Sequence, residues 1–488
     1  MKTYDLVVIG SGPGGQKAAI QAAKLGKEVC VIEKMDVVGG VAINTGTIPS
    51  KALREAVVDH LSARKALAET RNAGYLAFDR AETLAELMGS CQRVIRAEID
   101  IVRQQFSSNS IDLRRGWGSI AGEGVVSVRT ADENTESVRA RNILVAVGTS
   151  PARPSNIPFD NRQIFTSDDI LHIQKLPSTM LVVGGGVIGT EYASMLGALG
   201  VRVTLIEGRP RLLEFLDSEI CEALQYHLRQ TGVTLRLGEK VISIRKVASA
   251  PDEARGAGME LVEAVLESGK TLRAECLMYC IGRQGATERL GLETLGVKAD
   301  ERGRIKVNEH FQAVIPSPEK GQPARVVPGL YAVGDVIGFP ALASTSMEQG
   351  RVAACHMFGE QASSIPDLFP YGIYSVPEIS MVGWTEERLT EAGVPYESGI
   401  AQYKETARGH LLGDAIGMLK MLVHQESHVV LGVHCLGTGA TELIHIGQAV
   451  MAFQGTVEYF INAVFNYPTL AECYKVAAFN ALNKLKSR

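Results

Sequence analysis

The feature that most constrains the fold is a strand, glycine turn, helix and strand pattern that occurs twice. Residues 4–33 contain it around the turn Gly10-Ser-Gly-Pro-Gly-Gly15, and residues 180–207 repeat it around Gly184-Gly-Gly-Val-Ile-Gly189. Each copy ends on a glutamate that lies 23 residues after the first glycine of its turn. The repeat therefore predicts two βαβ modules of the same geometry in an α/β chain.

Modules of this kind bind dinucleotides. The first glycine makes the tight turn, the second lets backbone N–H groups approach a pyrophosphate, and the third lets the helix pack on the strand. The helix N-terminus attracts the phosphates, and the glutamate accepts hydrogen bonds from a ribose. A single glycine fingerprint is often only a turn, but two complete copies predict two dinucleotide sites. The residues are Gly10, Gly12, Gly15 and Glu33 in the first module, and Gly184, Gly186, Gly189 and Glu207 in the second.

A third motif assigns the two ligands. Gly329-Leu-Tyr-Ala-Val-Gly-Asp335 predicts a strand that ends in Gly-Asp, and residues 340–346 would begin a helix. In flavoproteins with this pattern the aspartate binds the flavin ribitol, and the helix N-terminus faces the ring and favours its reduced form. Taken alone, Asp335 could simply cap a helix. Together with both fingerprints, the motif assigns FAD to the first module and an exchanging NAD(P) to the second.

Composition excludes several classes of protein. With 488 residues, 45% of them hydrophobic and 21% charged, the chain is expected to fold into several α/β domains. A net charge of −4 gives no sign of a nucleic-acid partner. The N-terminus lacks a signal peptide, and no apolar run of about 18 residues occurs. We therefore expect a cytoplasmic protein without membrane contact. Residues 247–259 are interpreted as a polar surface loop.

The cysteines and histidines show no metal-site spacing. Eight scattered cysteines are expected to be reduced and mostly buried. Cys276 and Cys280 are expected in a strand, which would separate their Cα atoms by roughly 13 Å, whereas a disulfide needs about 7 Å or less. His434 and His445 are interpreted as core or surface residues, so no metal is predicted.

Motifs along the whole chain resemble the flavoprotein disulfide reductase family. The resemblance implies a FAD-binding domain whose first part is 1–155, an NAD(P)-binding domain at 156–276, a central domain at 277–350 that returns to the FAD domain, and a dimerisation domain at 351–488. It also implies a homodimer whose C-terminal domains complete each other's active sites. The matching segments are Gly10–Gly15, Gly39–Lys51, Ala146–Thr149, Gly184–Glu191, Cys280–Arg283, Gly329–Asp335 and Ser375–Gly383.

Two departures from the family pattern decide the expected chemistry. Where the family has a redox cysteine pair, this chain has Ala42 and Thr47. Where the family has a catalytic His-Pro-Thr-x-x-Glu, this chain has Tyr467-Pro-Thr-Leu-Ala-Glu472. Cysteines and base are replaced together, which is expected if thiol chemistry is absent. Reduction of glutathione, lipoamide, mercuric ion or trypanothione is therefore not expected.

Within the family, the chain resembles the branch of soluble, Si-specific pyridine nucleotide transhydrogenases. That branch implies FAD-dependent hydride transfer between NADPH and NAD⁺, in a ping-pong cycle through flavin N5 without a disulfide. An NAD(P)H:quinone or dye reductase is the alternative, and a non-catalytic, flavin-bound nucleotide sensor is a third reading. The segments that carry the resemblance are Gly46–Arg54, Gly186–Ser194, Arg211–Asp217, Glu442–Ala449 and Phe465–Thr469.

The resemblance also implies roles for the catalytic residues. Lys51 would lie beside flavin N5 and pair with Glu191, so that its charge favours reduced flavin; both could instead form a structural ion pair. Thr47 is expected to serve packing or a weak hydrogen bond. Tyr467 and Glu472 would approach the partner's flavin, and we favour Tyr467 as an aromatic plug in the space left by the lost disulfide substrate.

Coenzyme choice is expected at the end of the second module. Glu207 would accept a hydrogen bond from the 2′-hydroxyl of NAD, and Arg209 and Arg211 could pair with the 2′-phosphate of NADP. The alternative is two arginines on a solvated loop. The mixture predicts use of both coenzymes. By resemblance, Val241 and Gly282 also contact NAD(P), while FAD contacts Glu33, Lys34, Gly39, Gly40, Val41, Ala42, Lys51, Gly118, Gly148, Asp335, Ala341, Leu342, Ala343 and Ser344.

Overall fold

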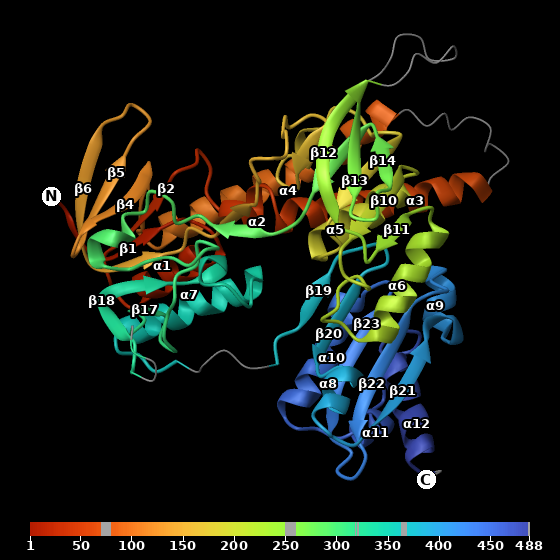
Figure 1. The fold of residues 1–488 in the computed structure, drawn as a ribbon. Coiled ribbons are helices and arrows are strands. Elements are labelled where there is room, and N and C mark those ends of the chain that lie inside the picture. The colour runs from red at the N-terminus through yellow and green to blue at the C-terminus, as the bar shows by residue number, and fades with distance from the viewer. Residues whose placement is uncertain (70–79, 249–259, 318, 320–321, 363–367, 487–488) are drawn as a thin grey trace. The chain divides into compact units, whose positions relative to one another are not determined.

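The chain forms two compact units, each built from three separate segments (Figure 1). Unit 1 comprises 1–53, 86–152 and 282–365, and unit 2 comprises 54–85, 153–281 and 366–488. The computed structural model describes residues 1–69, 80–248, 260–317, 319, 322–362 and 368–486. Most of the expected polar loop at 247–259 therefore lies outside the described residues.

Unit 1 is organised around one mixed sheet in the order β17-β18-β6-β1-β2-β3, in which β5 also pairs with β6 and β4 pairs with β5. Alternate residues of β1 enter two cores: Leu6 and Val8 pack with helices α1 and α4, whereas Val7 and Ile9 pack with β4 and β5. Helices α3 and α4 extend across the boundary of the unit along the chain. The bounds are β1 Thr3–Ile9, α1 Pro13–Lys24, β2 Val29–Glu33, α2 Gly40–Asn44, α3 Thr47–Glu69, α4 Arg80–Ser108, β3 Asp112–Arg115, β4 Trp117–Gly122, β5 Val125–Arg129, β6 Thr135–Val145, β7 Thr149–Pro151, β16 Arg283–Gly285, η3 Leu292–Leu295, β17 Gln312–Ile315, β18 Arg325–Ala332, η4 Gly334–Ile337 and α7 Ala343–Met357.

Helices α1 and α7 cross at two glycines in unit 1. A Cβ atom on Gly350 of α7 would lie 2.0 Å from the carbonyl oxygen of Gly14 in α1. Only residues without a side chain allow this approach, because real Cβ contacts are not that short. The crossing ties the helix of the first module to the helix that follows Asp335.

The nucleotide module of unit 2 has a parallel sheet in the order β11-β10-β9-β15-β8, accompanied by an antiparallel sheet of β12, β13 and β14. Cys276 lies in strand β15, as predicted, whereas Cys280, which was expected in the same strand, lies just after its end. The bounds are β8 Ile164–Thr166, η2 Ile170–His172, β9 Thr179–Val183, α5 Val187–Ala198, β10 Arg202–Glu207, α6 Ser218–Gln230, β11 Thr234–Leu237, β12 Val241–Ala248, β13 Glu260–Leu266, β14 Thr271–Ala274 and β15 Cys276–Tyr279.

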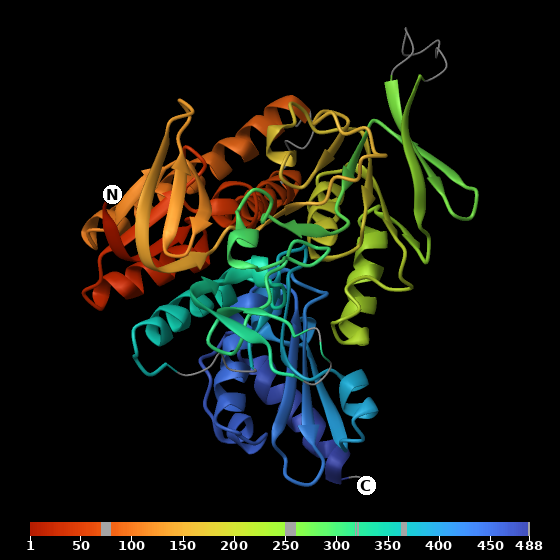
Figure 2. The ribbon, with the colours of Figure 1, turned by 60° about the vertical axis from the view of Figure 1, so that its left-hand side comes forward.

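The C-terminal part of unit 2 is a five-stranded antiparallel sheet in the order β19-β20-β23-β22-β21, shown in blue in Figure 2. Helices α10 and α12 cover it, and Leu443 and Tyr474 pack against strand residues such as Met421 and Val433. The bounds are β19 Tyr371–Ile373, β20 Ile379–Gly383, α8 Glu386–Glu391, β21 Tyr396–Gln402, η5 Tyr403–Glu405, α9 Ala407–Leu412, β22 Met418–His424, β23 Val430–Leu436, α10 Ala440–Ala452, α11 Glu458–Asn462 and α12 Glu472–Lys486.

The thiols agree with an expectation from the sequence. All eight cysteines are free, and all except the half-buried Cys280 are buried. Burial raises the pKa of Cys30 and Cys221 to about 12, so these thiols stay protonated. No helix in the described residues has the length and hydropathy to cross a membrane.

Candidate functional site

The turn of the first module needs its glycines for steric reasons. Gly10 has a φ of +105°, and a Cβ on Gly15 would lie 2.1 Å from the carbonyl oxygen of Gly10. A Cβ on Gly12 would meet nothing within 4 Å, so the backbone is open there. No side chain in the described residues caps the start of α1, which leaves its first N–H groups available to an anion. This geometry suits a bound pyrophosphate.

The second module repeats this geometry. Gly184 has a φ of +107°, and a Cβ on Gly189 would lie 1.9 Å from the carbonyl oxygen of Gly184. The space beside Gly186 is open, and α5 likewise begins without a side-chain cap from the described residues. The two turns therefore offer the same kind of anion site.

The terminal glutamates occupy equivalent positions but have different partners. Glu33 accepts hydrogen bonds from the N–H and the hydroxyl of Ser11 at 3.0 and 2.6 Å and from the N–H of Met35 at 2.9 Å. Glu207 accepts from the N–H of Gly185 at 2.6 Å and the N–H of Arg209 at 2.9 Å. The Arg209 side chain adds Nε to Oε1 and Nη2 to Oε2, both at 3.0 Å.

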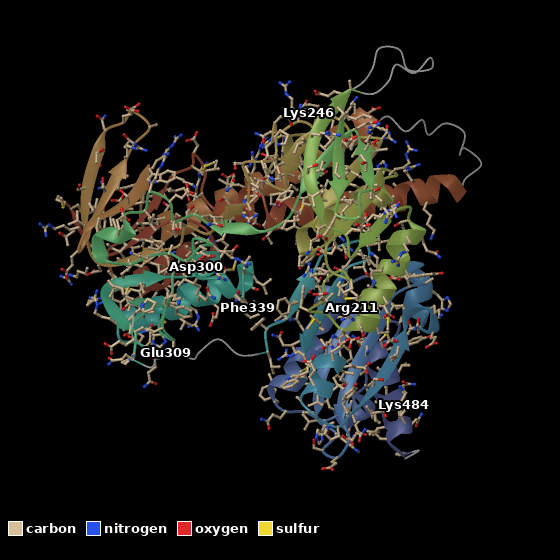
Figure 3. All side chains as sticks on the ribbon, viewed as in Figure 1. Arg211, Lys246, Asp300, Glu309, Phe339 and Lys484 are labelled. Carbon is tan, nitrogen blue, oxygen red and sulfur yellow. The ribbon has the colours of Figure 1, made fainter. Side chains whose placement is uncertain are left out.

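Arg209 controls the charge at the end of the second module. Burial would raise the pKa of Glu207, but the hydrogen bonds from Arg209 and from the N–H of Gly185 hold that pKa below its ordinary value. Arg211 instead lies 3.7 Å from Glu387, a residue of α8. Figure 3 labels Arg211 on the segment that leads from β10 to α6. The structure thus separates the two arginines that the sequence treats as equivalent.

Several further candidates for FAD contact lie in unit 1. Asp335, half-buried in η4, accepts a hydrogen bond from the hydroxyl of Thr149 at 3.3 Å, and Arg283 donates to that hydroxyl at 2.7 Å. The N-terminus of α7 has no side-chain cap among the described residues, and Ala341 to Ser344 are exposed or half-buried there. A Cβ on Gly40 would lie 2.9 Å from the Cα of Gly12, so the 39–42 turn approaches the pyrophosphate turn closely.

Other predicted contact residues are spread over both units. Gly118 in β4 packs against Ile9 and Ile32 of the first module, and Gly148 follows β6 with a φ of +65°. Lys34 is exposed, and its ammonium lies 5.0 Å from the ring centre of Trp117. Val241 begins β12 in unit 2, whereas Gly282 belongs to unit 1, with a φ of +83°.

The segment from Gly39 to Lys51 in unit 1 contains no cysteine. Ala42 lies in the short helix α2, and Thr47 begins α3. The backbone between them closes on itself, because the N–H of Gly46 donates to the carbonyl oxygen of Val41 at 2.7 Å. Lys51, one turn into α3, donates to the hydroxyl of Ser50 at 3.2 Å. The two positions where the family carries cysteines hold a methyl group and a hydroxyl.

Glu191 has a structural partner inside unit 2. Its side chain is buried in α5, and its carboxylate accepts a hydrogen bond from the N–H of Tyr374 at 2.9 Å. The hydroxyl of Ser194, three residues further along, accepts from the N–H of Val376 at 2.9 Å. Helix α5 therefore holds the backbone of residues 374–376, and pairing of Glu191 with Lys51 stays a prediction.

Tyr467 and Glu472 differ in exposure. Tyr467 is 74% exposed in the single chain, so it is not a core aromatic of its own chain, and its role as a plug across a dimer stays a prediction. Glu472 begins α12, and among the described residues its Oε2 is a buried oxygen with no hydrogen-bond partner. An unpaired buried carboxylate oxygen is costly.

Two family models match the chain. Residues 4–350 match the pyridine nucleotide-disulphide oxidoreductase model, and residues 369–478 match the dimerisation domain of that family. The chain belongs to the pyridine nucleotide-disulphide oxidoreductase family. In this family, a protein of Mycobacterium bovis (strain BCG / Pasteur) named soluble pyridine nucleotide transhydrogenase is 49% identical over 100% of this chain and 99% of its own.

A further relative and two solved structures are also similar to this chain. The soluble pyridine nucleotide transhydrogenase of Chromohalobacter salexigens is 42% identical over 99% of both chains. Among solved structures, LpdA of Mycobacterium tuberculosis has a TM-score of 0.83 at 24% identity, covering 98% of this chain and 99% of its own. The flavoprotein disulfide reductase RclA of Escherichia coli has a TM-score of 0.81 at 24% identity, with the same coverage. These two structures establish the shared fold.

This member of the family carries a charged cluster that the sequence analysis missed. The fully buried ammonium of Lys420 in β22 contacts Asp217 at 2.8 Å and Glu219 at 2.9 Å, and also contacts Glu386. The three carboxylates lie close enough together to hold a cation, and the lysine fills that position. Their separation along the chain explains why spacing rules did not find them.

The two histidines that were considered as metal ligands make hydrogen-bond contacts with other groups of the protein. His434 is buried, and its Nε2 lies 2.9 Å from the carbonyl oxygen of Trp384. Burial lowers the pKa of His434, which favours the neutral ring. His445 lies on α10, and its Nδ1 is 2.8 Å from Gln448. Ser11 was also missed, although its place inside the first fingerprint could have pointed to its bonds with Glu33.

Proposed function

We propose that this chain is an FAD-dependent, Si-specific transhydrogenase that transfers hydride between NADPH and NAD⁺ in a ping-pong cycle without a disulfide. The observation that carries the proposal is the combination of two complete, uncapped glycine turns with Ala42 and Thr47 at the positions of the family's cysteines. Two full-length relatives at 49% and 42% identity, both named soluble pyridine nucleotide transhydrogenase, support it.

The residues of unit 1 suit FAD. Gly10, Gly12 and the start of α1 would bind the pyrophosphate, Glu33 would accept from the adenosine ribose, and Asp335 would bind the ribitol. When bound, the flavin supplies an acceptor and donor of hydride at N5. The N-terminus of α7 would place partial positive charge beside the ring, which favours its reduced state.

The nicotinamide site would serve both half-reactions. Gly184, Gly186 and the start of α5 would hold the pyrophosphate of either coenzyme, so that one enters after the other has left. Lys51 would add positive charge near the reacting atoms, and Glu191 would keep it in place. Positioning of two flat rings, rather than acid–base chemistry, accounts for catalysis in this scheme.

We also propose a cytoplasmic homodimer. The match of residues 369–478 to a dimerisation domain supports the dimer. The eight free thiols suit a reducing compartment, where disulfides seldom persist. Tyr467 and Glu472 would then approach the flavin of the partner subunit.

The test is a two-step anaerobic reaction of the purified holoprotein. One equivalent of NADPH is added first, then NAD⁺, while flavin absorbance and NADH formation are followed together. Rapid reoxidation of the flavin with stoichiometric NADH is the expected result. A flavin that stays reduced with NAD⁺ but is reoxidised by a quinone would replace the proposal with the quinone reductase. A flavin reoxidised by neither would favour a nucleotide sensor.

A further inference from the structure

The two glutamates that end the modules differ in how many hydrogen bonds their carboxylates accept. Glu33 receives three hydrogen bonds, and the residue two positions later, Met35, offers only its backbone N–H. Glu207 receives four, and the residue two positions later, Arg209, binds it through both backbone and guanidinium. A carboxylate has about four acceptor positions, so Glu207 is saturated by its own chain.

This saturation bears on both coenzymes. The ribose 2′-hydroxyl of NAD(H) can donate to Glu207 only if the Arg209 side chain leaves, because that side chain occupies one acceptor position on each oxygen. The 2′-phosphate of NADP(H) would be repelled by a bare carboxylate, but the Glu207–Arg209 pair has no net charge. A guanidinium also matches a phosphate through paired hydrogen bonds.

We propose that Arg209 is an exchangeable counter-ion of Glu207 and the residue that gives this site its dual coenzyme specificity. NAD(H) displaces the guanidinium and takes its place on the carboxylate. NADP(H) draws the guanidinium onto its 2′-phosphate. The proposal rests on the proposed function and adds to it the residue that discriminates between the two substrates.

The backbone around Arg209 allows a movement of its side chain alone. The N–H of Gly238 donates to the carbonyl oxygen of Arg209 at 2.9 Å, and the N–H of Glu239 donates to that of Glu207 at 3.1 Å. The loop after β10 is therefore fixed to the turn after β11. The Arg209 side chain is 45% exposed, whereas that of Glu207 is 9% exposed. The partner that can leave the pair without a movement of the backbone is therefore the more exposed arginine.

Arg211 has a different environment. Its guanidinium lies 3.7 Å from Glu387, whose carboxylate also accepts the N–H of Ser218 at 3.0 Å at the start of α6. Buried Cys221 of α6 lies near the same positive charge. Arg211 therefore belongs to the contact between α6 and α8, and we assign it no part in coenzyme discrimination.

The experiment measures binding by calorimetry to the FAD-loaded protein, with 2′,5′-ADP and 5′-AMP as probes that differ only in the 2′-phosphate. Arg209→Gln should weaken 2′,5′-ADP binding about 10- to 100-fold, the loss expected for a charge-assisted pair of hydrogen bonds. Binding of 5′-AMP should stay equal or become a few-fold tighter. Glu207→Gln should do the reverse, weakening 5′-AMP and strengthening 2′,5′-ADP. Arg236→Gln is the matched control: it takes away an exposed positive charge that lies on strand β11, and it should leave the ratio of the two affinities unchanged.

Several outcomes would overturn the proposal. It fails if Arg209→Gln leaves the ratio of the two affinities within twofold of wild type, or if Arg211→Gln moves that ratio instead. It also fails if Glu207→Gln weakens both probes equally, since that would indicate a purely structural pair. Failure of the wild-type protein to bind either probe would refute the nucleotide site itself, and hydride transfer is not needed for any of these readings.

Discussion

Replacing Lys420 by Met would break the most deeply buried ion pair among the described residues. The Lys420 and Asp217 side chains are 1% and 0% exposed, and their charged atoms lie 2.8 Å apart. Burial alone would lower the pKa of Lys420, but its bonds to Asp217 and Glu386 raise it above its ordinary value. The ammonium therefore stays charged at neutral pH, and methionine would leave Asp217 without its cation.

The expected cost follows from what Asp217 keeps. Removing one partner of a buried pair costs about 3–5 kcal/mol. Asp217 retains hydrogen bonds from the N–H of Glu219 at 3.2 Å and of Glu386 at 3.3 Å. These bonds partly compensate the charge, so we expect the lower limit, about 3 kcal/mol. This corresponds to an opening equilibrium that rises about a hundredfold.

Native-state hydrogen exchange is the assay, because it measures opening of one region without assuming that a protein of several domains unfolds in one step. Peptides that cover β22 and the start of α6 should exchange about a hundredfold faster in Lys420→Met. Lys246→Met is the matched control: Lys246 pairs with Asp160 and Glu260 with 30% exposure on β12 (Figure 3). Its loss should cost under about 1 kcal/mol.

An exchange rate in β22 that differs less than fivefold between Lys420→Met and wild type would refute this reasoning. Such a result would mean that backbone hydrogen bonds or water compensate the negative charge of Asp217 to the same degree as the lysine does. Equal effects of Lys420→Met and Lys246→Met would refute it too, since burial is the only reason to expect a difference.

Two further predictions concern pH and the glycine turns. Burial by itself would raise the pKa of Glu387, but hydrogen bonds, chiefly those from Ser218, outweigh burial and lower this pKa from 4.5 to about 2. Its stabilisation is therefore fully present above pH 4.5 and lost as the pH falls toward 2. Glu387→Gln should lower the free energy of unfolding by about 1 kcal/mol at pH 7, a value discounted for exposure, and the melting-temperature gap to wild type should shrink below pH 4.5. A gap that stays constant down to pH 3 would contradict this. Gly189→Ala places a methyl 1.9 Å from the carbonyl oxygen of Gly184 and should weaken NADP⁺ binding more than tenfold while FAD stays bound; Gly122→Ala, which meets nothing within 4 Å, is the control measured in the same titration.

Local spacing explains what the sequence could predict. Both modules were expected because the first glycine of each turn has a positive φ and the third is imposed by a contact with the first, such as that between Gly15 and Gly10. The strand at Cys276 followed from its apolar pattern in the same way. Such contacts depend on the chain nearby and recur wherever the turn recurs.

Contacts between distant segments could not be predicted in this way. Lys420 and Asp217 are 203 positions apart, and Ser218 and Glu387 are 169 apart, so no periodicity links them. The different roles of Arg209 and Arg211 also escaped prediction, because Gly208 and Pro210 leave the course of the loop open in sequence terms. Tertiary hydrogen bonds to the turn at Gly238 fix that course.

The glycine crossing of α1 and α7 sets an order of events during synthesis. Helix α1 is among the first segments to leave the ribosome, but its partner begins only at Ala343. At about 5–20 residues per second, the nascent first module waits roughly 20 to 70 s for the helix that packs against it. During that interval the face of α1 around Gly14 lacks its packing partner, so a chain that stops before Ala343 leaves this face uncovered by α7.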